Sequence, residues 1–417
     1  MTLESGSFSY HDMERIIHTL QNGLRVIAER SDGNVAYIGV LTNAGSRDDG
    51  QDRDGLAHFV EHTVFKGTAA RNSWQISNRM ESVGGELNAY TTKEEIMLYT
   101  NAPSGYEERA VELLSDLVES ASFPNAELDL ERGVIIEEIH SYRDNAAYAV
   151  FDEFDELFYK GSGLAHNILG YQNTVERLDS RSAREFLTSY FAPANMVLYC
   201  VAPSDPQRNL RLIEKHFGSL RRPMPSLMRP EPELNAVFDE TRSRDNSQAN
   251  VVLGRRIFGM HDQRRYALFL LSNMLGGPAM NSRLNRELRE RRGLVYTVES
   301  IASLYSNAGA FQIYFGCEPR NVNKCVCIIE RELDSLAQKR LSQRMFDMAL
   351  RQLCGQLLVS GDNRENCAMS YAKSLMRHGE VHDNRHTAER IRSLTADDIR
   401  ELAQLICSRP VSKLTIV

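Results

Sequence analysis

The middle of the chain separates two halves of similar length. Between Arg221 and Pro232 the sequence RRPMPSLMRPEP holds four prolines and shows no sustained periodicity. Proline lacks a backbone donor and restricts the residue before it, so this stretch predicts an extended linker. A chain of 417 residues also exceeds the usual size of one domain. We therefore predict an N-terminal domain over 1–220, a linker over 221–240 and a C-terminal domain over 241–417.

Both halves have the same predicted order of elements. From about residue 35 the apolar pattern indicates a strand, two helices, two strands and two helices, and this order repeats from about residue 250. The two early helices of the second half are predicted over 265–277 and 281–293, each ending at glycine. We expect an α+β fold of two homologous domains, each a mainly antiparallel sheet flanked by helices.

Composition restricts the classes of partner. Apolar residues make up 42% of the chain and charged residues 25%, which is ordinary for a globular protein. The formal net charge of −7 argues against a general nucleic-acid or anionic-membrane partner. No apolar run is long enough to span a membrane, and the N-terminal stretch has no secretory pattern. The seven cysteines have no C-x-x-C spacing, which predicts reduced thiols and a cytoplasmic location.

The stretch GLAHFVEHTVFKGT, which begins at Gly55, carries the most informative ionisable cluster. On a helix, His58 and His62 lie one turn apart on one face, and Glu61 shares that face. Asp54 is the predicted N-cap of this helix. Two imidazole nitrogens at this spacing suit zinc, whose catalytic sites use three protein ligands and leave one position open. Glu61 is then the candidate base rather than a ligand.

A simpler interpretation is a surface helix with two solvated histidines. The H-x-x-E-H pattern arises by chance in roughly one chain in fifty of this length, so alone it is moderate evidence. However, Phe59, Val60 and Val64 make this helix largely apolar around the cluster. Burying histidine and glutamate there without partners is costly, and a bound metal removes that cost.

A third ligand is predicted within LERGVIIEEIHSY. Glu131 and Glu138 are seven residues apart and share one helix face, whereas Glu137 points roughly 100° away. A glutamate on a helix is usually a solvated surface charge. Beside a buried H-x-x-E-H, Glu138 becomes an oxygen-ligand candidate. Glu131 is then a candidate for orienting His58 or His62 by hydrogen bonding.

These motifs together resemble the pitrilysin superfamily, also called the insulinase family, of zinc metallopeptidases. The closest likeness is to the single-unit branch that includes mitochondrial processing peptidase and its bacterial relatives. The resemblance implies that His58, His62 and Glu138, which follows His62 by 76 residues, bind one zinc ion per chain. It also implies that Glu61 is the general base, that Glu131 is an auxiliary acid, and that the two domains form one half of a clamshell.

Two further stretches carry the resemblance. GGELNAYTT is similar to the family's edge strand, where Asn88 and Ala89 face the substrate backbone. Without the zinc motif, an ordinary strand would be the preferred interpretation. In NRELRERRGLVYTV, Arg289 and Tyr296 have the spacing of the family's Arg–Tyr pair. The resemblance implies that this pair comes from the second domain and that Tyr296 stabilises the developing oxyanion. Without the resemblance, the arginines are an ordinary basic helix end.

The implied function is zinc-dependent endopeptidase activity on short or unfolded peptides inside a closed chamber. Because the chain holds both the zinc motif and the Arg–Tyr pair, we expect a homodimer. The start of the sequence lacks a transit-like, Arg-rich pattern, which favours a bacterial cytoplasm over an organelle. Two alternatives stay open at this point. One is a non-catalytic structural subunit, and the other is a peptidase subunit that depends on a related partner chain.

Overall fold

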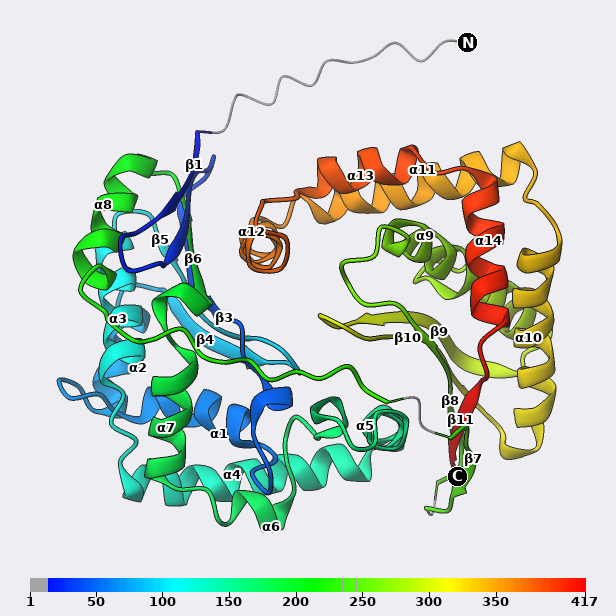
Figure 1. Ribbon diagram of the computed structural model, residues 1–417, viewed down its shortest axis with the longest axis horizontal. Coiled ribbons are helices and arrows are strands. Elements are labelled where there is room, and N and C mark those ends of the chain that lie inside the picture. Colours follow the sequence, from blue (N-terminus) through cyan, green and yellow to red (C-terminus); the bar gives the residue numbers. More distant parts are fainter. Residues whose placement is uncertain (1–13, 234–235, 245) are drawn as a thin grey trace.

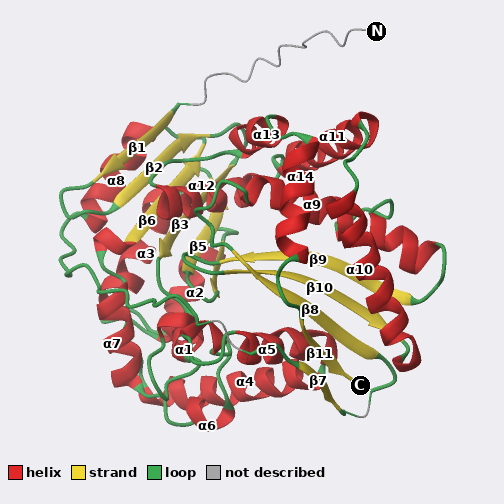
Figure 2. Cartoon of the chain, turned by 45° about the vertical axis from the view of Figure 1, so that its right-hand side comes forward, coloured by secondary structure: helices red, strands yellow, loops and turns green. Residues whose placement is uncertain are grey.

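The computed structural model describes residues 14–233, 236–244 and 246–417. The predictions for the first residues and for part of the linker therefore lie outside these ranges. The chain forms two sheets, each flanked by helices, side by side along the longest axis (Figures 1 and 2). The predicted α+β class with two sheets is confirmed. Within the described ranges, no helix is long and apolar enough to cross a membrane.

The first sheet has six strands in the order β1-β2-β6-β3-β5-β4. All neighbours are antiparallel except β2 and β6, which are parallel, and β4 lies at an edge. The central strand β6 is buried along its whole length. The strands are β1 (Arg15–Thr19), β2 (Arg25–Arg30), β3 (Val35–Thr42), β4 (Glu86–Thr91), β5 (Ile96–Pro103) and β6 (Met196–Ala202).

The helices of the first half pack their apolar faces against this sheet in one hydrophobic core. Their starts are set by short polar residues: Asn72, Asp179 and Asp205 cap their helices by accepting backbone hydrogen bonds. The helices are α1 (Leu56–Thr63), α2 (Ser73–Glu81), α3 (Glu107–Ser120), α4 (Asn125–Asp144), α5 (Ala146–Phe158), α6 (Gln172–Val175), α7 (Ser180–Tyr190) and α8 (Pro206–Phe217).

The second sheet has the order β7-β11-β8-β10-β9, with β9 at an edge. Only β7 and β11 pair in parallel within the described strands. The strands are β7 (Asp239–Arg242), β8 (Ala249–Ile257), β9 (Val295–Leu304), β10 (Gly309–Cys317) and β11 (Ser412–Ile416). The helices are α9 (Arg265–Gly276), α10 (Val322–Gln338), α11 (Gln343–Ser360), α12 (Arg364–His378), α13 (Asn384–Arg392) and α14 (Ala396–Cys407).

The second early helix of this half differs from the expectation of a regular helix over 281–293. Residues Asn285–Glu290 form a π-helical segment instead. Arg291 and Arg292 both donate to the carboxylate of Glu287, at 2.6 Å each, and hold the end of this segment. π-Helical turns are rare and frequently lie at functional sites.

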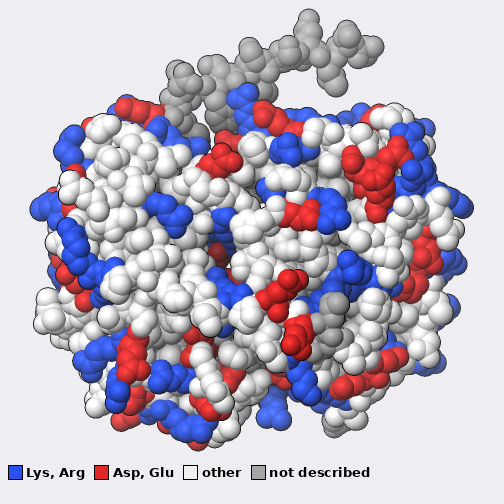
Figure 3. Space-filling view, in the orientation of Figure 1, with Lys and Arg blue, Asp and Glu red and all other residues white. Residues whose placement is uncertain are grey.

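Each half lends one helix to the other sheet. Helix α5, from the first half, packs through Val150 and Phe154 against the second sheet. Helix α12, from the second half, packs through Ala368 and Ala372 against the first sheet. Figure 1 shows both helices between the two sheets, and Figure 3 shows a hollow near the centre of the same face. The helix packing therefore crosses the boundary between the two predicted domains.

The turn between β4 and β5 carries three consecutive buried charges, Lys93, Glu94 and Glu95, and the two glutamates join the two halves. Glu94 accepts from Arg47 at 2.5 Å and from the Ser306 hydroxyl and backbone N–H at 2.6 and 2.8 Å. Because Ser306 lies in the β9–β10 turn, this carboxylate links the two sheets. Glu95 accepts ion pairs from Lys373 and Arg377 of α12 at 2.9 and 2.7 Å.

Replacing Glu94 with glutamine is expected to destabilise the fold by about 3–5 kcal/mol, because it leaves the buried Arg47 guanidinium without its counter-charge. Urea unfolding of the purified protein measures this loss. Glu81→Gln, at an exposed position of α2, is the matched control and is expected to change stability by less than about 0.5 kcal/mol. An equal effect of the two substitutions would contradict the role of Glu94.

Candidate metal centre

Helix α1 starts differently from the prediction that Asp54 caps it. The N-cap is Gly55, whose φ of 90° lies in the left-handed region. A side chain at Gly55 would also meet the Leu169 carbonyl oxygen at 2.6 Å, so glycine is required there. The carboxylate of Asp49 accepts the N–H groups of Gly55 and Ala57 at 2.8 Å each. Asp49 thus accepts hydrogen bonds from two backbone N–H groups at the start of α1.

The helix places its two histidines against the core. Phe59 and Val60 are fully buried beside His58, and α1 packs against β4, α4 and α7. His58 is 5% exposed, and its Nδ1 atom is buried without a hydrogen-bond partner among the described residues. An apolar environment around a largely unpartnered imidazole fits a metal ligand better than a solvated surface histidine.

Three donor atoms converge between α1 and α4. The Nε2 atoms of His58 and His62 lie 3.6 and 3.4 Å from Oε2 of Glu138. Within the described ranges, these three residues form the one group whose donor atoms all lie within 4.8 Å of one another. Tetrahedral zinc with bonds of 2.0–2.1 Å requires ligand atoms about 3.3–3.4 Å apart. The donor set and its spacing therefore fit a zinc ion.

Glu131 orients the exposed side of this cluster. Its Oε2 lies 3.2 Å from Nδ1 of His62, so Nε2 of the same ring is directed to Glu138. Its Oε1 accepts an ion pair from Lys66 at 2.5 Å. A carboxylate on the second nitrogen of a ligand histidine fixes the ring and its tautomer. The prediction for Glu131 named either histidine, and the geometry places it on His62.

Burial and neighbouring charges separate the proton affinities of the two histidines. Burial, reinforced by His62, lowers the pKa of His58 to about 4. Burial also acts to lower the pKa of His62, but its hydrogen bonds with Glu138 and Glu131 raise the pKa above its ordinary value. The hydrogen bond to His62 in turn lowers the pKa of Glu138. Near neutral pH, His58 and Glu138 therefore present free lone pairs.

Glu61 lies on the same helix, between the cluster and strand β4. Burial raises the pKa of its carboxyl group, while Thr91 and His62 act in the opposite direction. Its proximity to His62 and Glu138 places it beside the donor cluster rather than in it. A carboxylate with a raised proton affinity is suited to accept a proton from a nearby water.

Asn88 and Ala89 lie on β4, an edge strand as predicted. Their register partners on β5 are Tyr99 and Leu98, and within the described sheet β4 has no neighbour on its other side. The free edge can pair with an extended peptide. Because α1 packs against β4, this edge is close to the helix that carries the histidines.

Arg289 and Tyr296 lie in the second half, away from the three donor residues in sequence. Arg289 is exposed in the π-helical segment, and its guanidinium lies 3.8 Å from Sδ of Met280. Tyr296 is 56% exposed near the start of β9. Within the described ranges, no hydrogen bond or ion pair joins either side chain to the cluster. Of the predicted site residues, the structure thus brings together only those of the first half.

The sequence analysis missed Asp49 and Lys66. Asp49 lies in a polar loop with several aspartates, and no spacing rule singles it out. Lys66 follows His62 by four residues, which places both on one helical face. That spacing was the available signal for Lys66, whereas the contact of Asp49 depends on the left-handed turn at Gly55.

Two sheets with a His-His-Glu cluster between helices α1 and α4 are consistent with a metallopeptidase of the inverted H-x-x-E-H type. Residues 25–172 match the family model described as insulinase, peptidase family M16. Residues 177–353 match the model described as peptidase M16 inactive domain. The chain belongs to the insulinase family, peptidase family M16, and the predicted resemblance is confirmed.

Relatives of known name extend along most of the chain. An uncharacterized zinc protease of Streptomyces coelicolor is 31% identical, and the alignment covers 94% of this chain and 87% of that protein. The beta subunit of the mitochondrial-processing peptidase of Bos taurus is 28% identical over 76% of this chain and 67% of that protein. A protease structure from Helicobacter pylori has a TM-score of 0.87, 20% identity, and coverage of 97% and 99%. At 20% identity, the likeness to the Helicobacter pylori structure concerns the fold alone.

Proposed function

We propose that this protein is a zinc-dependent endopeptidase that hydrolyses short or unfolded peptides. The single observation that carries the proposal is the convergence of His58 Nε2, His62 Nε2 and Glu138 Oε2 at zinc-ligand spacing, with the partly buried Glu61 beside them. Three protein ligands leave one position of a tetrahedral metal open for chemistry. Relatives named zinc proteases support the choice of metal and reaction.

The chain supplies the proton transfers of the reaction. Zinc, when bound, lowers the pKa of a water molecule and polarises the scissile carbonyl. Glu61 accepts the proton of the attacking water and later donates it to the leaving amine. Glu131 holds the ring of His62 in the orientation that directs its Nε2 toward Glu138.

The substrate peptide binds as an added strand on the free edge of β4. Asn88 is exposed on this edge and Ala89 is half-buried, so both backbones are accessible to an extended chain. Backbone pairing is independent of side-chain identity, and it requires the substrate to be extended. Short or unfolded peptides meet that requirement, whereas a folded protein does not.

Arg289 and Tyr296 complete the site when the second half closes over the bound peptide. Tyr296→Phe is expected to lower kcat by about 10²–10³-fold, because it removes one donor to the developing oxyanion. KM is expected to change little, since the contact forms in the transition state. Steady-state kinetics on one peptide measure both values. Tyr106→Phe, at another exposed tyrosine, is the control, and an equal loss in both variants would refute this role.

The active form in this proposal is a homodimer in the bacterial cytoplasm, with the peptide enclosed in a chamber. The supporting argument is that one chain carries both the metal-site residues and the Arg–Tyr pair. The similar proteins of Streptomyces and Bacillus subtilis have bacterial sources. A chamber admits only substrates that thread into it, in agreement with strand addition on β4.

One alternative has its own observation: the relative from Bos taurus is named as a subunit, so activity could require a partner chain. Size-exclusion chromatography of the isolated protein, combined with cleavage of an unfolded peptide mixture, separates the cases. We expect a dimer that cleaves peptides without a partner. An inactive isolated chain with a full complement of zinc would favour the partner-dependent subunit. An inactive chain without zinc would favour a structural subunit.

A further inference from the structure

A cavity of about 310 Å³ lies between α9, α12 and strand β9, outside the metal centre. One part of its lining is basic and the other is apolar. Lys and Arg side chains line it together with two histidines, and its lining includes no aspartate or glutamate. The basic residues are Arg265, Lys373, Arg377, His378 and His382, and the apolar part includes Met260, Phe269 and Leu304.

Arg265 is a buried cation that forms no ion pair with any described residue. The residue is 7% exposed. Its guanidinium donates to the hydroxyl of Tyr266 at 2.9 Å and to the carbonyl of Asp262 at 3.3 Å. The Asp262 carboxylate itself is held by Arg264, at 2.9 and 2.5 Å. No carboxylate of a described residue forms an ion pair with Arg265. A buried guanidinium in this state is costly unless an anion joins it.

The neighbouring charges do not remove this surplus. Lys373 and Arg377 share one carboxylate, that of Glu95, so these two cations at the cavity have a single acid between them. His382 is paired with Glu380 at 2.8 Å. Burial, Arg265 and the nearby basic side chains lower the pKa of His378 to about 4. The direction of that effect is consistent with a positive potential in the cavity.

We propose that this basic cavity binds one oxyanion of carboxylate or phosphate size, with Arg265 as its principal donor. The planar guanidinium offers paired donors that match either group. The apolar side of the cavity fits the last residue of a peptide, whose carboxylate then meets Arg265. A free inorganic oxyanion such as phosphate has the same chemistry at the donor. The peptide source rests on the proposed peptidase function, and the phosphate source does not.

In this proposal, a peptide whose end lies in the cavity and that runs along β9 also reaches Tyr296. Ala302, which lines the cavity, is on β9 six residues after Tyr296. Six residues of extended strand span about 20 Å. Helix α12 packs on the first sheet and β9 belongs to the second, so an anion here contacts elements associated with both sheets.

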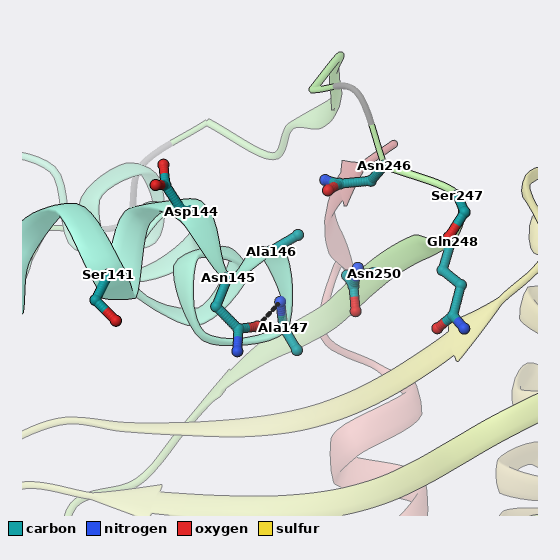
Figure 4. A pocket seen from close by; sticks show the side chains of 9 residues that line it. All are labelled: Ser141, Asp144, Asn145, Ala146, Ala147, Asn246, Ser247, Gln248 and Asn250. Carbon is teal, nitrogen blue, oxygen red and sulfur yellow. Dashed lines mark hydrogen bonds between the residues drawn. The ribbon is translucent and has the colours of Figure 1, made fainter.

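A second cavity of about 590 Å³ has no comparable feature (Figure 4). It lies where α4 ends and β8 begins, and amides and hydroxyls make up most of its polar lining. Asp144 is the one charged residue in that lining, and Asn145 already caps α5 by accepting from Ala147 at 3.1 Å. The unpaired buried cation therefore distinguishes the cavity at Arg265.

The first test is a titration of the purified protein with inorganic phosphate, against sodium chloride at equal ionic strength. We expect a saturable rise of the melting temperature in the parent and in Arg320→Met, whose arginine is exposed, paired with Glu318 and outside the cavity. Arg265→Met is expected to weaken phosphate by about tenfold or more. Phosphate bound at zinc instead would act equally in all three proteins. Equal responses of parent and Arg265→Met would overturn the proposal.

Ser370→Asp is the second variant, because Ser370 is exposed, lines the cavity and tolerates a side-chain change. An internal carboxylate there is expected to abolish the phosphate response even if Arg265→Met fails to fold. An undiminished response in Ser370→Asp would overturn the proposal.

The second arm compares two peptides that differ only in a terminal carboxylate or carboxamide. A lower KM for the carboxylate, lost in Arg265→Met, identifies the peptide terminus as the source. Equal KM values with a retained phosphate response identify a free oxyanion. A parent protein that responds to neither phosphate nor the carboxylate would refute the site. The phosphate arm needs no cleavage, so it stays decisive if the peptidase proposal fails.

Discussion

Glu61→Gln is expected to lower kcat for peptide cleavage by about 10²–10⁴-fold, which is the usual contribution of a general base. The amide is nearly isosteric with the carboxylate but cannot accept the proton of the attacking water. The metal donors are on other side chains, His58, His62 and Glu138. Zinc binding and the fold are therefore expected to survive this substitution.

The matched control for this prediction is Glu119→Gln, at an exposed position near the end of α3. Zinc content by metal analysis and kcat on one defined peptide are measured for the parent and both variants. The base assignment is wrong if Glu61→Gln cleaves the peptide as fast as the parent. A variant that loses both zinc and activity would instead make Glu61 part of the metal shell.

The second large effect is expected from Glu138→Gln. Removing the carboxylate leaves two imidazole donors, and the amide is a much weaker ligand for zinc. Loss of an outer-shell partner alone costs 10–100-fold in metal affinity, so loss of a direct ligand is expected to exceed about 10²-fold. Cleavage is expected to fall to the level of the metal-free protein.

Glu137→Gln gives the sharpest control for Glu138, because it is the adjacent glutamate on the same helix and is exposed. Competition with a chromophoric chelator measures zinc affinity for both variants. We expect parent-like affinity in Glu137→Gln and strongly reduced affinity in Glu138→Gln. Similar affinities in the two variants would mean that the helix face bearing Glu138 does not reach the metal.

The parts of the site that local periodicity determines were accessible from the sequence. The spacing of His58 and His62 and that of Glu131 and Glu138 place each pair on one helix face. The structure then brings those two faces together, with Glu138 near both histidines. Helix α9, which ends at Gly276 and Gly277, and the presence of strand β4 likewise follow local signals, whereas the edge position of β4 was expected from the resemblance.

Other features depend on tertiary contacts and could not be predicted. The cap of α1 comes from Asp49, because Gly55 turns the chain back toward that loop. The exchange of α5 and α12 between the sheets follows from which apolar faces meet after folding, and helix periodicity carries no such information. The unpaired state of Arg265 depends on where Arg264 and Asp262 point. A run of arginines in the sequence gives no sign of it.

The central claim, a catalytic zinc site, is tested most directly by metal analysis combined with a cleavage assay on one protein sample. The assay uses an unfolded peptide mixture before chelation, after chelation and after return of zinc. The account predicts one zinc ion per chain, cleavage that disappears on chelation, and recovery when zinc is restored. A protein that purifies without stoichiometric zinc, or that cleaves equally well after complete chelation, would contradict it.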